Sequence, residues 1–309
     1  MQTQAYEMET IVILQQMAVI ACLVLIGYGT YKKKVIDNRF CRQLSVLIVD
    51  FTNPALMISA VLSGEITASR KDVLTALLIA AVLYAILCVL GATVPRFLGV
   101  EQEDRRFYHL LTVYTNTGFI GIPLATAILP ENAMIYVIVF NIMFSIYMYT
   151  HGVLVLGGEG IQLKKLISPG TIAAIAALLI YWFRIPVPDM PANFVHYLGN
   201  STTFLTMIML GASIAQQSII ACFKDKVVWR YIIYRMLLLP AVLILALKAM
   251  HLNPDMILAY CLMLALPAAN MPLILAEKEG YPTATLSKVI LTTTLVSFFT
   301  ITCLLSVLF

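Results

Sequence analysis

Runs of apolar residues, each long enough to cross a lipid bilayer, follow one another along the whole chain. Hydrophobic residues make up 61% of the sequence and charged residues 12%, whereas soluble domains carry roughly 25% charged residues. Because the apolar residues are continuous and do not alternate, the pattern predicts an all-α membrane protein rather than a β-barrel. With about 20 residues per transmembrane helix, we expect ten spans, at 11–30, 44–63, 72–94, 107–129, 133–156, 168–184, 199–218, 228–248, 255–276 and 284–308.

The lysines and arginines are distributed unevenly between alternate loops. Fifteen of the 20 lie in or beside the loops 31–43, 95–106, 157–167, 219–230 and 277–288, and the other set of loops holds four, counting the adjoining Arg184 and Lys248. The positive-inside rule makes the first set cytoplasmic, so that both termini lie outside the cytoplasm. We therefore expect a multi-pass plasma (inner) membrane protein whose partner is the lipid bilayer, with no basic surface for nucleic acid.

Ten spans divide into two halves of five, and an odd number makes the halves insert with opposite orientation. This is the inverted-repeat arrangement found in many secondary transporters. The predicted units are a first five-helix repeat at 1–156, a short cytoplasmic linker at 157–167 and a second repeat at 168–309.

Two of the predicted spans contain residues that interrupt a helix. Residues 116–124 read Asn-Thr-Gly-Phe-Ile-Gly-Ile-Pro-Leu, and residues 265–273 read Ala-Leu-Pro-Ala-Ala-Asn-Met-Pro-Leu. A break in lipid frees backbone groups that must be paired or line a polar cavity. Interrupted spans at corresponding positions of two halves indicate the binding site of a transporter.

The residue types at the two breaks favour an anion. Pro123 and Pro272 suit the first turn of a second half-helix, whose N-terminus carries about half a positive charge. Asn116, Thr117 and Asn270 add hydrogen-bond donors without a negative charge. The alternative is a pair of proline kinks packed against neighbouring helices. The substrate-binding residues that we predict are Asn116, Thr117, Gly118, Gly121, Pro123, Pro267, Ala268, Asn270, Pro272 and Arg235.

Asp50 is the only carboxylate well inside a predicted span, and an intramembrane carboxylate is a functional-site candidate by default. If it is buried, it could carry a coupling H⁺, while Thr52 and Asn53 could help to bind Na⁺. The alternative is an aspartate near the cytoplasmic end that reaches water or pairs with a base. No other cofactor is expected, since the six cysteines show no metal-ligand spacing.

Arg235 lies inside the eighth predicted span, about two turns from its cytoplasmic end. Its guanidinium could face the cavity and hold a carboxylate bidentately. Long arginine side chains also extend to the membrane interface, and the sequence leaves both interpretations open.

The sequence resembles the auxin efflux carrier family in its short microbial form. The matching residues are 116–123 at the first break, Ala265-Leu266-Pro267 with Met271-Pro272 at the second, 52–56 in span two and 235–240 in span eight. The resemblance implies the fold shared with bile-acid sodium symporters, in which the broken helices four and nine cross. It also implies a small organic anion as substrate, such as malate or malonate, with Asn116 at the substrate carboxylate, and a homodimer as in plant members.

Two features depart from the family pattern. The loop 157–167 is shorter than the cytoplasmic loop of plant auxin carriers, and Asp50 stands where we expect Asn in many microbial relatives.

The leading hypothesis from the sequence is a secondary transporter that moves a small mono- or dicarboxylate by alternating access. One alternative is a sodium-coupled symporter of a larger amphipathic acid, and another is a non-transporting membrane sensor of anions. An enzyme is not expected, since the sequence has neither an HExxH nor a GxSxG motif.

Overall fold

The computed structural model of the chain describes residues 2–62, 66–157, 167–216 and 225–308. Every regular element in these residues is a helix. The helices are α1 (Gln2–Lys32), α2 (Asn38–Leu47), α3 (Asn53–Leu62), α4 (Arg70–Phe97), α5 (Arg105–Val113), α6 (Ile122–Ile128), α7 (Met134–Tyr147), α8 (Val153–Val155), α9 (Pro169–Phe183), α10 (Asp189–Ala215), α12 (Lys226–Ile232), α13 (Leu239–Ala249), α14 (Pro254–Ala265), α15 (Met271–Lys278) and α16 (Ala284–Leu308). Wider π-helical turns link or extend several of them, at Ile48–Thr52, Thr117–Gly121, Met148–Gly152 and Ile233–Leu238.

The described helices have the lengths and surfaces of a membrane protein. Six stretches are long and apolar enough to cross a bilayer: Asn38–Leu62, Arg70–Phe97, Glu131–Val155, Asp189–Ala215, Lys226–Ala249 and Ala284–Ser306. Large apolar side chains such as Leu78, Phe183 and Val242 are more than 60% exposed on the outer surface, where lipid would cover them. The prediction of an all-α, multi-pass integral membrane protein is confirmed.

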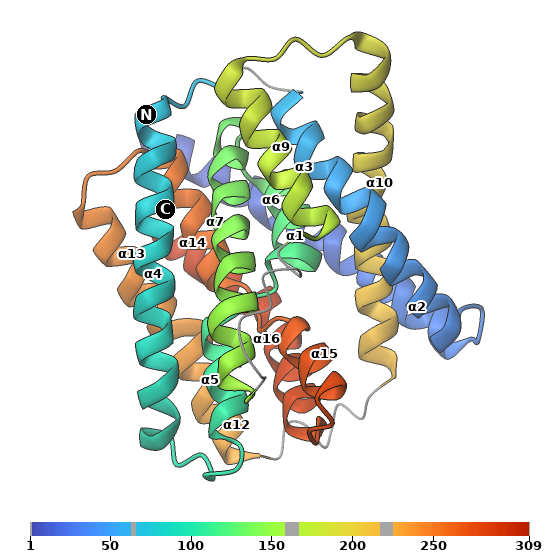
Figure 1. Cartoon of the computed structure of the whole chain (residues 1–309), viewed down its shortest axis with the longest axis vertical. Coiled ribbons are helices and arrows are strands. Elements are labelled where there is room, and N and C mark those ends of the chain that lie inside the picture. Colours follow the sequence, from blue (N-terminus) through green and yellow to red (C-terminus); the bar gives the residue numbers. More distant parts are fainter. Residues whose placement is uncertain (1, 63–65, 158–166, 217–224, 309) are drawn as a thin grey trace.

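The most enclosed helices are α7 and α14, which lie in the middle of the bundle (Figure 1). The ring of Phe140 on α7 lies 5.2 Å from that of Tyr260 on α14 and 5.1 Å from that of Tyr84 on α4. The hydroxyl of Tyr260 donates to the carbonyl oxygen of Ala76 at 2.7 Å. Aromatic packing and this hydrogen bond join three helices that are distant in the sequence.

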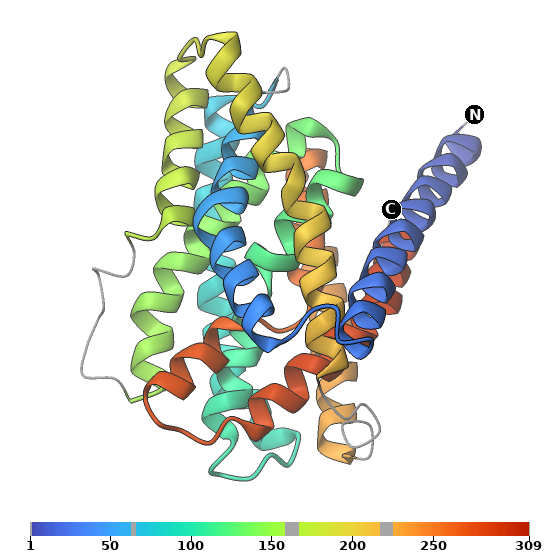
Figure 2. The ribbon, with the colours of Figure 1, turned by 90° about the vertical axis from the view of Figure 1, so that its right-hand side faces the viewer.

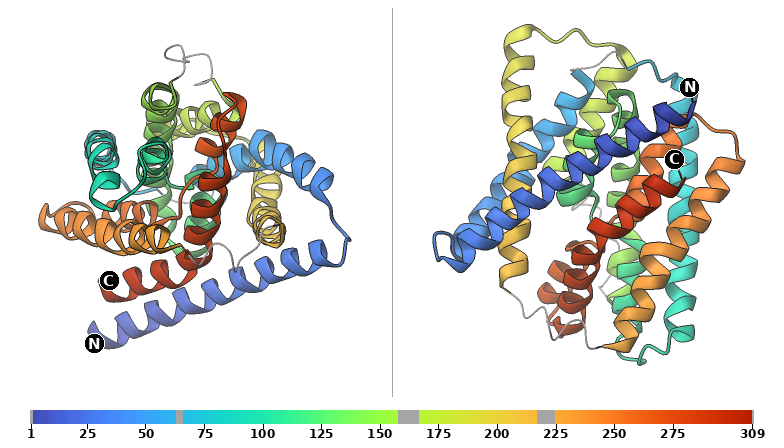
Figure 3. Two further views of the ribbon diagram at one scale, coloured as in Figure 1. Left: turned by 90° about the horizontal axis from the view of Figure 1, so that it is seen from below. Right: turned by 180° about the vertical axis from the view of Figure 1, so that it is seen from behind.

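Helix α1 packs closely across α10, as the two views of Figure 3 show. A methyl group at Gly27 of α1 would overlap the carbonyl oxygen of Ile208, and one at Gly211 of α10 would overlap that of Val24. Two helix backbones therefore meet without intervening side chains, the contact that small residues allow between membrane helices.

The predicted span at 199–218 starts late because the prolines of segment 185–198 are typical of a loop. Helix α10 begins ten residues earlier than this prediction. The helix starts at Asp189, directly after Pro188, and Pro191 falls in its first turn. A proline there costs nothing, since the first N–H groups of a helix have no partner within the helix. The expectation of a loop up to residue 198 is wrong for this reason.

The connections after α4 and after α15 lie at one end of the molecule, and the connection from α9 to α10 lies at the other (Figure 2). These are the ends at which basic residues are predicted to be abundant and sparse, respectively. The predicted linker at 157–167 lies almost entirely outside the described residues.

Candidate functional site

Two helices stop and restart side by side near the centre of the molecule. Helix α5 ends at Val113 and α14 ends at Ala265, and in each case the chain continues in an extended conformation. The extended segments pair in antiparallel fashion through Thr115 and Ala268. The N–H of Asn116 donates to the carbonyl oxygen of Pro267 at 2.8 Å, and that of Ala269 donates to the carbonyl oxygen of Tyr114 at 2.9 Å. Backbone groups freed by the breaks therefore satisfy one another.

The hydroxyl of Thr293 on α16 supports this pairing. The N–H of Ala268 donates to the Thr293 Oγ1 at 3.3 Å, and that oxygen donates in turn to the carbonyl of Val289 in its own helix. A third helix thus anchors the second interruption, which lies deep in the protein with Ala268 only 1% exposed.

The first helix restarts at Thr117, earlier than the proline alone suggests. The Oδ1 atom of Asn116 accepts a hydrogen bond from the N–H of Phe119 at 3.2 Å, so that its side chain caps a π-helical turn leading into α6. An N–H group requires an acceptor, and this fixes which way the Asn116 amide points. Its Nδ2 has no hydrogen-bond partner in the described part of the chain, and Asn116 is one of the residues that line a cavity.

Pro123 explains the position of Asn53. In the π-helical turn, Ile122 donates to the carbonyl of Thr117, five residues back. Residue 123 would donate to Gly118 in the same register, but proline has no N–H. The side-chain Nδ2 of Asn53 supplies the missing donor and binds the Gly118 carbonyl oxygen at 3.1 Å.

Gly121 lets the two interrupted helices approach each other. A methyl group at this position would lie 2.6 Å from Cδ1 of Leu266 and 3.2 Å from Cε of Met263. A larger residue would require the side chains of Leu266 and Met263 to shift.

The second helix restarts at Met271, with Pro272 in its first turn. Asn270 precedes the first helical residue, but its side chain makes no capping hydrogen bond. The side chain is half-buried and lies at the wall of the same cavity as Asn116. Its amide therefore has donor and acceptor capacity left for another molecule.

The cavity beside the crossing has a volume of about 70 Å³. Its polar lining residues are Asn116, Thr206, Ser213, Asn270, Ser287 and Thr294, and its apolar ones are Phe119, Ile120, Met209, Leu210, Ile214, Leu273, Ile290 and Leu291. The four hydroxyl residues come from α10 and α16, and the sequence interpretation missed them. Single Ser and Thr residues on apolar helices are common, and only the tertiary arrangement of α10 and α16 around the cavity brings these four together.

Thr117 does not line this cavity. It is fully buried and donates from Oγ1 to the Oδ1 of Asn141 on α7 at 2.8 Å. Asn141 is a second residue that the sequence interpretation missed, although a single amide within the apolar run 134–147 is a visible signal. The pair ties the restarted helix to the core.

The three residues predicted to couple an ion do not lie together at one site. Thr52 and Asn53 are buried, and Oγ1 of Thr52 and Oδ1 of Asn53 have no hydrogen-bond partner among the described residues. Asp50 is exposed and makes no ion pair or hydrogen bond with the described residues. Burial, the physical basis for a proton on Asp50, is absent within the chain, and the coupling roles of all three stay predictions.

Arg235 neither lines the cavity nor extends to the interface. Its side chain is 1% exposed. The Nε atom donates to the carbonyl oxygen of Thr112 at 3.0 Å, and Nη1 donates to that of Leu264 at 3.0 Å. These carbonyls belong to the last turns of α5 and α14, so that the guanidinium bridges the two helix ends at the crossing.

A histidine pair lies beside the first interruption. Tyr114 is the C-cap residue of α5. Its hydroxyl donates a hydrogen bond to the carbonyl oxygen of Tyr147 at 2.8 Å and forms another with Nδ1 of His151 at 2.9 Å. The rings of His151 and His109 lie 4.9 Å apart. The sequence spacing gave no sign that these two residues meet.

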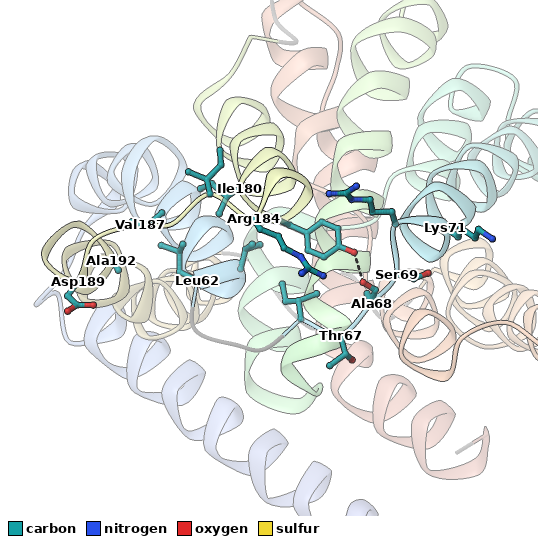
Figure 4. A pocket seen from close by; sticks show the side chains of 15 residues that line it. Leu62, Thr67, Ala68, Ser69, Lys71, Ile180, Arg184, Val187, Asp189 and Ala192 are labelled. Carbon is teal, nitrogen blue, oxygen red and sulfur yellow. Dashed lines mark hydrogen bonds between the residues drawn. The ribbon is translucent and has the colours of Figure 1, made fainter.

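A larger hollow lies elsewhere, at the end of the molecule where α9 connects to α10 (Figure 4). It has a volume of about 1100 Å³ and is lined by the basic residues Arg70, Lys71 and Arg184. None of the predicted site residues lines it. Among the described residues, no group of three or more His, Cys, Asp or Glu side chains could hold a metal ion.

Comparison with known sequences gives one match that covers nearly the whole chain. A family model described as membrane transport protein matches residues 12–165 and 155–305. No curated protein sequence matches the chain.

Proposed function

The chain belongs to the membrane transport protein family, the family of the auxin efflux carriers, and from this premise we propose that it is a secondary transporter of a small organic anion. The observation that carries the proposal is the cavity at the helix crossing. Two asparagines, one from each interruption, present side-chain amides with unused donors to one small space.

The chemistry of the cavity suits a carboxylate. Amide N–H groups and hydroxyls donate hydrogen bonds to carboxylate oxygens, and bonds to a charged acceptor are the stronger class. Ser213, Ser287 and Thr294 have side-chain hydroxyls without hydrogen-bond partners in the described residues. Among the described residues, no Asp or Glu lines the cavity, so that no carboxylate there repels an anion. The two restarted helices begin beside it, and their N-terminal N–H groups add positive potential.

The volume of the cavity favours a small substrate. A space of about 70 Å³ exceeds the roughly 10–15 Å³ that one water molecule requires. A space of this size favours a short mono- or dicarboxylate, such as malonate or malate, over a large amphipathic acid. This supports a small carboxylate over the symporter of a larger acid.

Transport would follow alternating access on a fold of ten spans in two inverted halves. The antiparallel pairing of Thr115 with Ala268 supports opposite insertion of the halves. The uneven lysine and arginine distribution supports cytoplasmic placement of the basic loops, with both termini outside. A ligand drives such a cycle through different affinities for the two states, or by lowering the barrier between them.

Topology can be tested by cysteine labelling in intact cells, in a background without the native cysteines. Lys33→Cys should resist an impermeant maleimide, and Arg184→Cys should react with it. The reverse labelling pattern would contradict the orientation.

The binding role is tested most cleanly at Asn270. Its side chain makes no capping hydrogen bond and none with the other described residues, so that Asn270→Ala removes a ligand contact without removing a cap. Losing one hydrogen bond to a charged group should weaken anion binding roughly tenfold to a hundredfold. The measurement is counterflow in proteoliposomes loaded with malonate, malate or another short carboxylate, which requires no ion gradient.

Asn193→Ala is the matched control, because Asn193 is exposed on α10 and lies outside the cavity. It should exchange the anion as the wild type does. Wild-type affinity in Asn270→Ala, or no exchange of any short carboxylate by the wild type, would contradict the proposal.

A further inference from the structure

Arg235 is the largest fully buried side chain among the described residues. Its partners are two main-chain carbonyls, those of Thr112 and Leu264, each at 3.0 Å. The remaining nitrogen, Nη2, is buried and has no acceptor in the described chain. The hydrogen bonds of the guanidinium therefore all go to the ends of two helices.

The two carbonyls have no partners within their own helices. Helix α5 ends at Val113 and α14 ends at Ala265, so that Thr112 and Leu264 lie in the last turns. The last four carbonyls of a helix lack an intrahelical donor. The guanidinium binds one such carbonyl from each helix and holds the two ends together.

The charge of Arg235 is balanced without a carboxylate. Among the described residues the ion pair that forms joins Lys288 and Asp225, and no acidic side chain pairs with Arg235. A buried charge without compensation is costly. Each helix C-terminus carries about −0.5 of an elementary charge, and two such ends together match one guanidinium.

This position has a known use in transporters with interrupted helices. The C-terminal ends of half-helices and the unwound carbonyls beside them bind coupling cations such as Na⁺. Here the guanidinium of Arg235 occupies the corresponding position at the C-terminal ends of α5 and α14. Arginine keeps its charge at every physiological pH.

We infer that Arg235 is a built-in cation of the crossing, which stands where a coupling cation would bind and makes anion exchange independent of Na⁺. The positive charge lies at the C-terminal ends of α5 and α14, and the cavity for the anion lies at the restarted helices beyond the interruptions. Independence from Na⁺ rests on the proposed anion transport, whereas the role of Arg235 at the two helix ends does not depend on it. Arg235 is a positioning residue, since it lies outside the cavity.

The first experiment removes the charge and measures folding stability without any substrate. Arg235→Met and Arg235→Ala should lower the melting temperature of the purified protein by roughly 10 °C. Millimolar guanidinium should restore part of this loss in Arg235→Ala, because it refills the space with the same charge and donors. Urea has the same shape without the charge, tetramethylammonium has the charge without donors, and neither should restore it.

Arg230→Met is the matched control. Arg230 lies on α12 five residues earlier, is exposed, and donates to a carbonyl of its own helix at 3.4 Å. Its replacement should leave the melting temperature unchanged and give no response to guanidinium.

The second experiment measures anion counterflow in proteoliposomes with Na⁺ or with choline. The wild type should exchange equally in both. Arg235→Ala should lose exchange and recover it with guanidinium or with Na⁺ at the emptied place. Arg235→Lys keeps the charge, so that it should fold even if the uncharged variants do not, and its exchange should need no Na⁺.

Several results would overturn the inference: wild-type exchange that requires Na⁺, an Arg235→Lys variant that requires it, wild-type stability in Arg235→Met, or rescue by urea as large as that by guanidinium. Rescue of the melting temperature in a protein that exchanges no carboxylate would instead count against the proposed substrate, and the built-in cation would stand.

Discussion

Replacing Gly27 by alanine should force α1 away from α10. The added methyl carbon would overlap the carbonyl oxygen of Ile208 and lie 2.8 Å from its carbonyl carbon and its Cα. Ordinary contact between carbon atoms needs about 3.5 Å, so that relief requires the backbones to separate by more than half an ångström. The obstacle is helix backbone, which cannot rotate aside as a flexible side chain can.

The cost follows from this geometry. Overpacking of one methyl group destabilises a protein by about 1–3 kcal/mol, and separating α1 from α10 also loosens the close contact at Gly211 on the other side. By the usual conversion, the melting temperature of Gly27→Ala should fall by roughly 3–10 °C. Because α10 carries Thr206 and Ser213 on the cavity wall, anion exchange should fall as well.

The matched control lies two residues further along the same helix. A methyl group at Gly29 meets no atom within 4 Å, and alanine in a helix is more stable than glycine by about 0.5–1 kcal/mol. Gly29→Ala should therefore melt at or above the wild-type temperature. The assay is thermal unfolding of purified variants in one detergent at one scan rate. If Gly27→Ala melts as high as Gly29→Ala, the close backbone contact between α1 and α10 is refuted.

Two further predictions concern polar pairs. Asn141→Leu leaves the buried hydroxyl of Thr117 unpaired and should cost about 1–3 kcal/mol, whereas Asn141→Leu with Thr117→Val should recover part of the loss in thermal unfolding. Burial raises the pKa of Asp225, but hydrogen bonds from Lys288 and from backbone N–H groups outweigh burial and leave this pKa lowered. A carboxyl group whose pKa is lowered by folding stabilises the folded state at pH values above its ordinary pKa, near 4. This stabilisation is lost as the pH falls through the pKa that the group has in the folded protein. Asp225→Asn should thus melt below the wild type at neutral pH, and the two melting curves should converge in acid; a gap that persists in acid would contradict this.

Several features of the fold can be predicted from local chemistry. Continuous apolar runs exclude a soluble domain. The glycines and prolines at 118–123 and 267–272 lie within a few residues of the two interruptions, because each of these residue types disfavours a regular helix in any surroundings. The place of the first restart was less predictable. It depends on the cap by Asn116 and on the hydrogen bond that Asn53 donates to Gly118, 65 residues further along the chain.

The sequence by itself determined the membrane class, the interruptions and the two asparagines at them. Only the tertiary structure decided what surrounds these residues. A run of apolar residues predicts a helix but leaves its rotation about its own axis open, so that it cannot say which face meets a neighbour. For this reason the sequence could not show that Asp50 is exposed, that hydroxyls of α10 and α16 line the cavity, or that Arg235 binds the ends of two helices.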